Sequence, residues 1–143
     1  MLRHALPLIA MLGMVTPAMA QTPAASIEDF QGRWQIADVV GYADTSDGIP
    51  LAKELLGQTV VITTTSIDLN GEKCQPDDGF KVRQVADTTR MLSESAGAHP
   101  DDAELPPSVW MLDSSRCAPV FLLGKDRIEI DVMGVFVRAY RMK

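Results

Sequence analysis

Alternating apolar and polar positions dominate this chain and predict strands over most of its length. The clearest example is the segment 127–132, in which Ile128, Ile130 and Val132 share one face while charged residues occupy the other. Further strands are expected where β-branched or alternating residues lie between turn signals, over 33–40, 59–65, 66–70, 80–85, 109–113, 120–123 and 135–141. The pattern therefore indicates about eight strands.

Helical signals are sparse, and the best of them lies in the segment 50–56. Pro50 suits the first position of a helix, and Gly57 suits the position just after its end. Leu51 and Leu55 lie four residues apart and share one helical face. Many strands with one short helix after the first strand predict a mainly β fold, an antiparallel barrel or sandwich.

One long connection interrupts the strand pattern between residues 86 and 108. It is rich in proline and contains the acidic residues Asp101, Asp102 and Glu104 close together. A connection of this length without its own pattern is usually either functional or disordered. We therefore treat these three acids as candidate contacts for a partner.

The N-terminus predicts export. Residues 1–20 have the three parts of a secretory signal peptide: Arg3 and His4 give a basic start, an apolar run follows, and Ala18-Met19-Ala20 provides a cleavage site. The apolar run is too short to span a bilayer, so we expect cleavage rather than insertion in the membrane. The expected location of the mature protein is the periplasm or the outside of the cell.

Cleavage would leave 123 residues, which suit one domain with one core. We expect a flexible tail over 21–25 and a single β-barrel domain over 26–143. The signal takes away one basic residue and no acidic residue, so the net charge changes from −6 to −7. An acidic chain without a basic run is a poor partner for nucleic acid or an anionic membrane, whereas a basic protein partner is electrostatically allowed.

The two cysteines, Cys74 and Cys117, predict a structural disulfide, because an even pair in an exported chain is usually bonded. A redox or metal pair is the alternative, but neither cysteine stands in a Cys-x-x-Cys motif.

Catalytic signals are weak. His99 is the single histidine after the signal peptide and lies in the acidic connection, so neither a nucleophile–histidine pair nor a classical zinc site is expected. Glu129 and Asp131 lie two apart on one strand and form a pair of carboxylates. Because the opposite face of that strand is apolar, we expect both acids to face solvent. The sequence therefore predicts a non-enzymatic protein without a metal or cofactor.

Aromatic and basic residues near the two ends of the domain suggest how a barrel would close. Trp34 opens the first strand, and Arg138, Tyr140 and Arg141 lie in the last one. The first and last strands of a closed barrel are neighbours, so the tryptophan and an arginine could stack there. A core tryptophan with unrelated surface arginines is the alternative.

Gly32-x-Trp34 together with Arg138-x-Tyr140 resembles the calycin superfamily, the lipocalins and fatty-acid-binding proteins. This resemblance implies a lipocalin-like barrel of about eight strands, with the helix at 50–56 near its mouth. It also implies that Trp34, Arg138 and Tyr140 contact the ligand, with the last two holding a carboxylate. If Val135, Val137 and Ala139 line the core instead, Arg138 and Tyr140 point outward and lose that role.

Three functions remain, of which the last is a purely structural role in the cell envelope. The first is a lipocalin-like carrier that holds a small amphipathic molecule in its interior. The second is an inhibitor or immunity-type protein that blocks a basic secreted enzyme through Asp101, Asp102 and Glu104. A hollow interior favours the carrier, and an interior filled by large side chains favours the protein-binding module.

Overall fold

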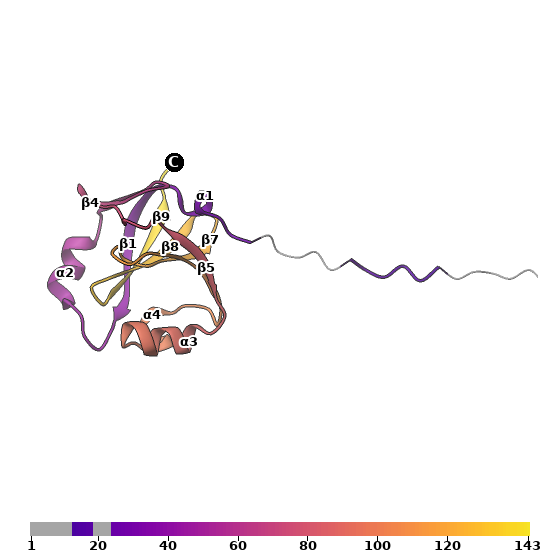
Figure 1. Ribbon diagram of the computed structural model, residues 1–143. Helices are drawn as coiled ribbons and strands as arrows, with labels where there is room; N and C mark the ends of the chain where they lie inside the picture. The colour runs from indigo at the N-terminus through magenta and orange to yellow at the C-terminus, as the bar shows by residue number, and fades with distance from the viewer. Residues whose placement is uncertain (1–12, 19–23) are drawn as a thin grey trace, which may run out of the picture.

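The computed structural model describes residues 13–18 and 24–143, which include all of the predicted β domain (Figure 1). The predicted signal peptide and the tail lie mostly on residues 1–12 and 19–23, outside the described residues. The elements are α1 (Ile27–Phe30), β1 (Gly32–Tyr42), α2 (Gly48–Leu55), β2 (Thr59–Ile62), β3 (Ile67–Leu69), β4 (Glu72–Cys74), β5 (Lys81–Val85), α3 (Thr88–Met91), the π-helical turn η1 (Leu92–Ala96), α4 (Pro100–Ala103), β6 (Val109–Asp113), β7 (Val120–Gly124), β8 (Arg127–Val132) and β9 (Val135–Arg141).

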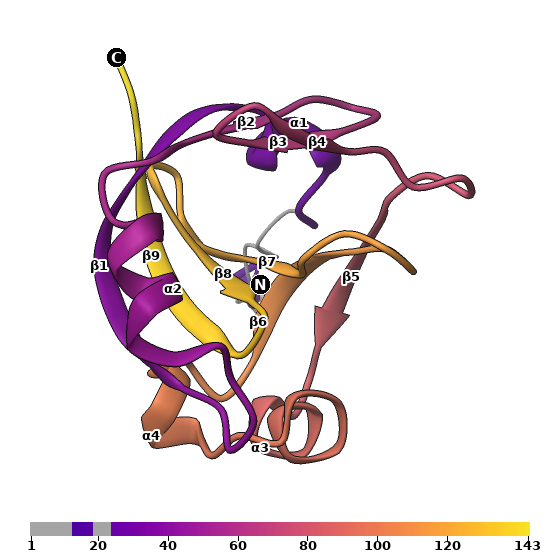
Figure 2. The ribbon, with the colours of Figure 1, turned by 90° about the vertical axis from the view of Figure 1, so that its left-hand side faces the viewer.

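The nine strands form one antiparallel sheet in the order β4-β3-β2-β1-β9-β8-β7-β6-β5. The sheet curls into a half-barrel, and the first and last strands lie side by side, as expected (Figure 2). The mainly β fold and the helix after the first strand are therefore confirmed. The strand count is nine rather than about eight, because the hairpin turn at Asn70-Gly71 leads into the short strand β4. Three residues are too few to show an alternating pattern.

Alternation along the strands creates two apolar faces. The inner face includes Trp34 of β1, Val60 of β2 and Ile130 of β8, all buried. The outer face is also apolar where β7 and β9 contribute Phe121 and Phe136, which are buried as well. Both faces of this part of the sheet therefore need a cover.

The segment 86–108 provides the outer cover. It folds into α3, η1 and α4, and its side chains Leu92, Ala103 and Leu105 pack with Phe136 and Phe121. Figure 2 shows these helices outside the curl of the sheet. The long connection is thus a packed part of the fold, in which burial of its few apolar residues replaces a periodic helical pattern.

The sheet does not close through hydrogen bonds, because β4 and β5 are its two edges. A disulfide crosses this seam: Cys74 at the end of β4 is bonded to Cys117 in the β6–β7 connection, with Cα atoms 5.7 Å apart. The predicted structural bridge is confirmed. Since disulfides persist mainly in oxidising compartments, the bond indicates a protein that works outside the cytoplasm. Within 13–18 and 24–143, no helix has the length and apolar character needed to cross a bilayer.

Arg141 holds the C-terminal end of β9 in place. Its guanidinium lies 4.1 Å from the centre of the Trp34 ring, which forms the predicted stack of the tryptophan with an arginine of the last strand. The same group donates hydrogen bonds to the carbonyl oxygens of Gln31, Asp29 and Lys125, at 2.6, 3.1 and 3.0 Å. Arg141 therefore joins α1, the β7–β8 turn and the core in one place.

Removing the disulfide is expected to destabilise the domain strongly. The double substitution Cys74→Ser and Cys117→Ser opens a covalent loop with a sequence separation of 43, which should lower the free energy of unfolding by about 4 kcal/mol. Urea denaturation of the two proteins measures this difference.

Arg116→Gln provides the comparison, because it removes only an exposed ion pair with Asp77, 3.4 Å long, beside the same seam. That change should cost less than about 1 kcal/mol. Equal effects of the two changes would show that the covalent link does not hold the seam.

Candidate functional site

A hollow with apolar walls lies at the seam of the half-barrel, between β3 and β8. It has a volume of about 260 Å³. Alternation directs Ile67 and Leu69 of β3 and Ile130 of β8 to the inner face, where they line this hollow with side chains from the seam and the β8–β9 turn. The full lining, called the apolar groove below, comprises Val60, Ile67, Leu69, Glu72, Lys73, Cys74, Ala118, Ile130, Val132 and Met133.

Two further hollows adjoin the apolar groove and share Val132 and Met133 with it. The smaller has a volume of about 180 Å³ and lies against α2, whose Leu51 and Leu55 line it. The larger has a volume of about 580 Å³ and is called the polar cleft below. Its polar lining comes from the loop after β1, η1, the β6–β7 connection and β8, and comprises Thr45, Ser46, Asp47, Ser95, Arg116 and Asp131.

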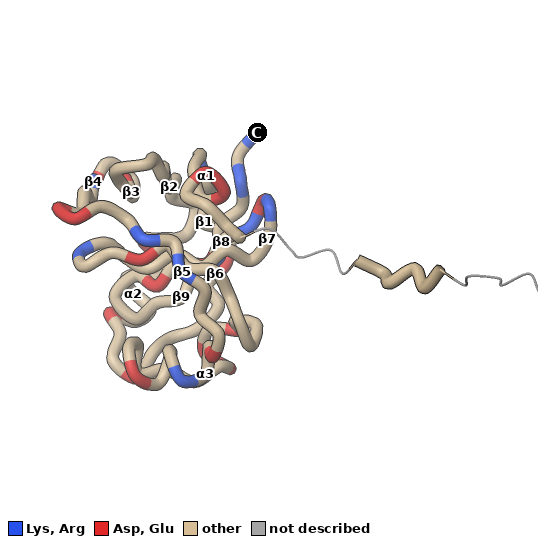
Figure 3. The backbone as a smooth tube through the Cα atoms, turned by 45° about the vertical axis from the view of Figure 1, so that its right-hand side comes forward, with Lys and Arg blue, Asp and Glu red and all other residues tan. Residues whose placement is uncertain are grey.

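The surroundings of these three hollows carry more acidic than basic groups. Four carboxylates, Asp47, Glu54, Glu72 and Asp131, line them against two cations, Lys73 and Arg116. Figure 3 shows acidic residues near β4 and near α3. The site therefore disfavours an anionic ligand.

Asp131 is the carboxylate of the polar cleft that the fold holds most closely. Its Oδ1 atom accepts a hydrogen bond of 2.9 Å from the backbone N–H of Gly134. Burial raises the pKa of Asp131, and this hydrogen bond opposes the increase. The side chain thus anchors the β8–β9 turn as well as lining the cleft.

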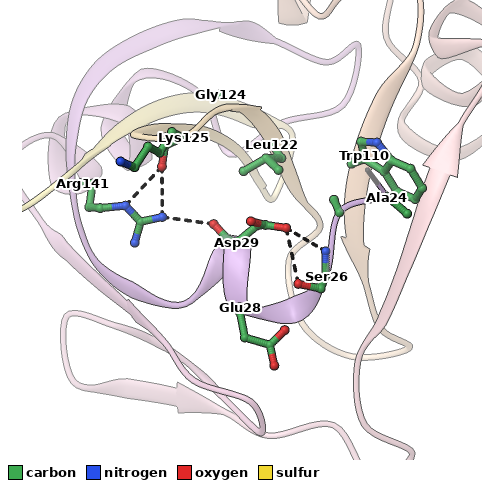
Figure 4. A pocket seen from close by; sticks show the side chains of 10 residues that line it. Ala24, Ser26, Glu28, Asp29, Trp110, Leu122, Gly124, Lys125 and Arg141 are labelled. Atoms are coloured by element: carbon green, nitrogen blue, oxygen red, sulfur yellow. Dashed lines mark hydrogen bonds between the residues drawn. The ribbon is translucent and has the colours of Figure 1, made fainter. Parts of the chain in front are cut away.

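A hollow of about 860 Å³ lies near the C-terminal end of β9, between α1 and the strands β6 and β7 (Figure 4). Arg141 faces it, but its guanidinium is already engaged with backbone carbonyl oxygens and with Asp126 at 3.3 Å. Asp29 likewise accepts hydrogen bonds from Ser26, as Figure 4 shows. Arg141 and Asp29 therefore hold α1 and the end of β9 in place and are poorly placed to bind a ligand.

The three residues expected to contact a ligand do not come together. Trp34 is completely buried, and its indole N–H donates to the carbonyl oxygen of Phe30 at 3.0 Å. Arg138 and Tyr140 lie on the outer face, because their neighbours Val137 and Ala139 occupy the core. The condition under which these two residues lose a carboxylate-binding role in the interior is therefore met.

Tyr140 forms a contact on the surface of the sheet instead. Its hydroxyl donates a hydrogen bond of 2.9 Å to Asp38 on the neighbouring strand β1. This hydrogen bond is the main reason that the pKa of Tyr140 is raised.

Arg138 belongs to a buried ion network on the outer face. Its Nη2 atom lies 3.4 Å from Glu129 and 3.6 Å from Glu104. Glu129 is completely buried, which corrects the expectation that it faces solvent; the helical cover over the outer face is the reason. Within the described residues, Oε1 of Glu129 has no hydrogen-bond partner. Desolvation raises the pKa of Glu129 to about 7 despite the attraction of Arg138.

The acids of the long connection are used mainly inside the fold. Asp102 accepts a hydrogen bond of 2.8 Å from the backbone N–H of His99 at the start of α4, and Glu104 contacts Arg138. Asp101 is exposed. Across 13–18 and 24–143, no group of three or more histidine, cysteine or acidic side chains is arranged to hold a metal ion.

The buried carboxylate predicts an unusual dependence of stability on pH. The pKa of Glu129 is about 7 in the folded protein against an ordinary value of 4.5, so the folded state binds more protons between these values. The contribution of this group to the free energy of unfolding should therefore fall as the pH rises from 4.5 to 7, by about 3 kcal/mol in total. Glu129→Gln removes the titration, and thermal unfolding of both proteins across this range isolates it.

Asp101→Asn, which removes an exposed carboxylate, serves as the control and should follow the wild-type pH curve. A Glu129→Gln curve parallel to that of the wild type would contradict the assignment of the raised pKa to Glu129.

Comparisons of the chain with protein-family models, with curated proteins and with solved structures each found no match.

Proposed function

We propose that this chain is an exported, non-enzymatic binding protein, acting in the periplasm or outside the cell, that holds a small amphipathic molecule at the seam of the half-barrel. The observation that carries this proposal is the apolar groove of about 260 Å³, which meets the polar cleft at Val132 and Met133. A molecule with an apolar part and a polar part fits such a junction, because each part finds walls of its own kind.

Exposed apolar side chains near this junction support the proposal. Met133 at the β8–β9 turn is 70% exposed, and Ile49 and Leu56 at the two ends of α2 are 61% and 46% exposed. Single exposed apolar residues are ordinary, but α2 and the β8–β9 turn both border the hollow that contains Leu51 and Leu55. Met133, which lines all three hollows, would shield the apolar part of a bound molecule from water.

The size of the groove limits the ligand. Typical sites for drug-sized molecules have volumes of roughly 300–1,000 Å³, so only a small apolar part fits into 260 Å³. Large buried side chains, among them Phe30, Trp34 and Leu112, fill much of the interior. The proposed ligand therefore lies along the seam, with its polar part in the cleft, rather than in the centre of the barrel.

The charge of the surroundings selects the polar part. With Asp47, Asp131, Glu54 and Glu72 around the hollows, an uncharged or cationic head group is favoured over an anionic one. One of the two cations, Arg116, already contacts Asp77. This preference differs from the carboxylate recognition that the Arg138-x-Tyr140 pattern implied.

The alternative, a protein that blocks a basic secreted enzyme through Asp101, Asp102 and Glu104, has less support. Asp102 accepts a hydrogen bond at the start of α4 and Glu104 contacts the partly buried Arg138, so two of the three acids already have partners in the fold, although Glu104 stays 63% exposed. The filled interior, in contrast, favours this module over a carrier that holds its ligand in the centre of the barrel.

Binding of amphipathic probes tests the proposal. The fluorescence of N-phenyl-1-naphthylamine, an uncharged apolar probe, should rise on addition of the protein. Dodecyl maltoside and dodecyltrimethylammonium should displace this probe at lower concentrations than dodecanoate, because the site carries an excess of carboxylates.

Ala118→Phe, which fills the groove from the seam, should weaken probe binding by about tenfold or more, equivalent to about 1.4 kcal/mol. Ala37→Phe adds the same side chain at an exposed position of β1 and should leave binding unchanged. Absence of probe binding by the wild type, or equal binding by both variants, would refute the proposed site.

A further inference from the structure

The turn between β8 and β9 contains an unusual residue for its backbone geometry. Met133 and Gly134 form a two-residue connection, with φ angles of +49° and +79°. Hairpin turns with positive φ at both positions strongly prefer Asn-Gly, because asparagine and glycine tolerate the left-handed region. A methionine at the first position therefore incurs a steric penalty.

Another hairpin of this chain has the preferred Asn-Gly sequence. Asn70 and Gly71 join β3 to β4 with φ angles of +50° and +91°. An aspartate two residues before each turn accepts a hydrogen bond from the glycine N–H: Asp68 from Gly71 at 2.7 Å, and Asp131 from Gly134 at 2.9 Å. The two turns are thus built alike, except that methionine replaces asparagine in the second.

Packing of the fold does not explain the methionine. Its side chain is 70% exposed, so it gains little burial in return for the strained backbone. The turn is held through backbone atoms instead, since Asp47 N–H donates to the Met133 carbonyl at 3.0 Å and Ala43 N–H donates to the Gly134 carbonyl at 2.8 Å. These bonds do not depend on the side chain at position 133.

The position of the side chain offers a functional explanation. Met133 lines the apolar groove, the hollow at α2 and the polar cleft, so it lies where all three meet. Methionine is flexible and polarisable and adapts to apolar ligands of different shape. Backbone strain that side-chain packing does not offset is found preferentially at ligand-binding positions.

We infer that Met133 is a specificity-determining residue: its thioether chain covers the apolar part of an uncharged or cationic amphiphile where that part leaves the groove for the polar cleft. This inference rests on the proposed function. It predicts that position 133 is selected for ligand contact at the expense of turn stability.

The substitution Met133→Asn tests the inference, because it separates stability from binding. Asparagine relieves the turn, so the thermal midpoint should be unchanged or higher than that of the wild type. Affinity for N-phenyl-1-naphthylamine should fall about tenfold, because the apolar cover is lost. Met133→Leu keeps an apolar chain of similar size and should retain affinity within about threefold of the wild type.

The opposite exchange supplies a stability control. Asn70→Met places methionine in the matching turn and should lower the thermal midpoint, which measures the penalty of this residue in such a turn.

The outcomes distinguish the two proposals. If Met133→Asn binds the probe as the wild type does while Ala118→Phe does not, the role of Met133 is overturned and the proposed site stands. A lowered thermal midpoint in Met133→Asn would also overturn the inference, because the methionine would then be structural. If the wild type binds neither the probe nor any of the three dodecyl amphiphiles, the proposed function itself fails.

Discussion

The absence of a backbone ladder between β4 and β5 is the constraint on which the rest of this structure depends. A curled sheet with two free edges leaves inner-face side chains uncovered at the seam, and the short β4 covers little of them. The Cys74–Cys117 bond fixes the width of this gap without filling it, since a disulfide contributes a link but little volume. The apolar groove is the space that remains, which is why Cys74 and Ala118 appear in its lining.

The two ends of the half-barrel differ in how the ends of β9 are held. At its C-terminal end, Arg141 stacks on Trp34 and ties α1 and the β7–β8 turn to the sheet. At its N-terminal end, the Met133–Gly134 turn is held by backbone bonds to the loop after β1 and by the hydrogen bond from Gly134 N–H to the Asp131 side chain. At the C-terminal end of β9, the charged group of Arg141 forms contacts within the fold, whereas at the N-terminal end the apolar side chain of Met133 is exposed. We therefore expect a ligand to bind mainly at the N-terminal end of β9.

The sequence pattern could predict strands with a regular alternation of apolar and polar residues. It could not predict burial that depends on which other segment packs over a strand. The strand pattern identified β8 and β9, but the three-residue strand β4 has no readable period. The burial of Glu129 was unpredictable for a different reason. Alternation places it opposite Ile128 and Ile130, and only the aperiodic segment 86–108, folding back on that face, turns an outward position into a buried one.

The arrangement of side chains on β9 explains why the candidate site lies at the seam and not on β9, where the sequence pattern had placed it. Trp34 lies on the first strand, and Arg138 and Tyr140 lie on the neighbouring last strand. Side chains alternate between the two faces of a strand, so the arginine and tyrosine share the outer face while the tryptophan lies inside. Once the helical cover buries Glu129, a nearby cation favours its charged form, although burial still raises the pKa of Glu129 to about 7. Arg138 is that cation and is thereby unavailable to a ligand. The residues left to make a site are those that line the hollows at the seam, namely the groove wall and the strained methionine beside it.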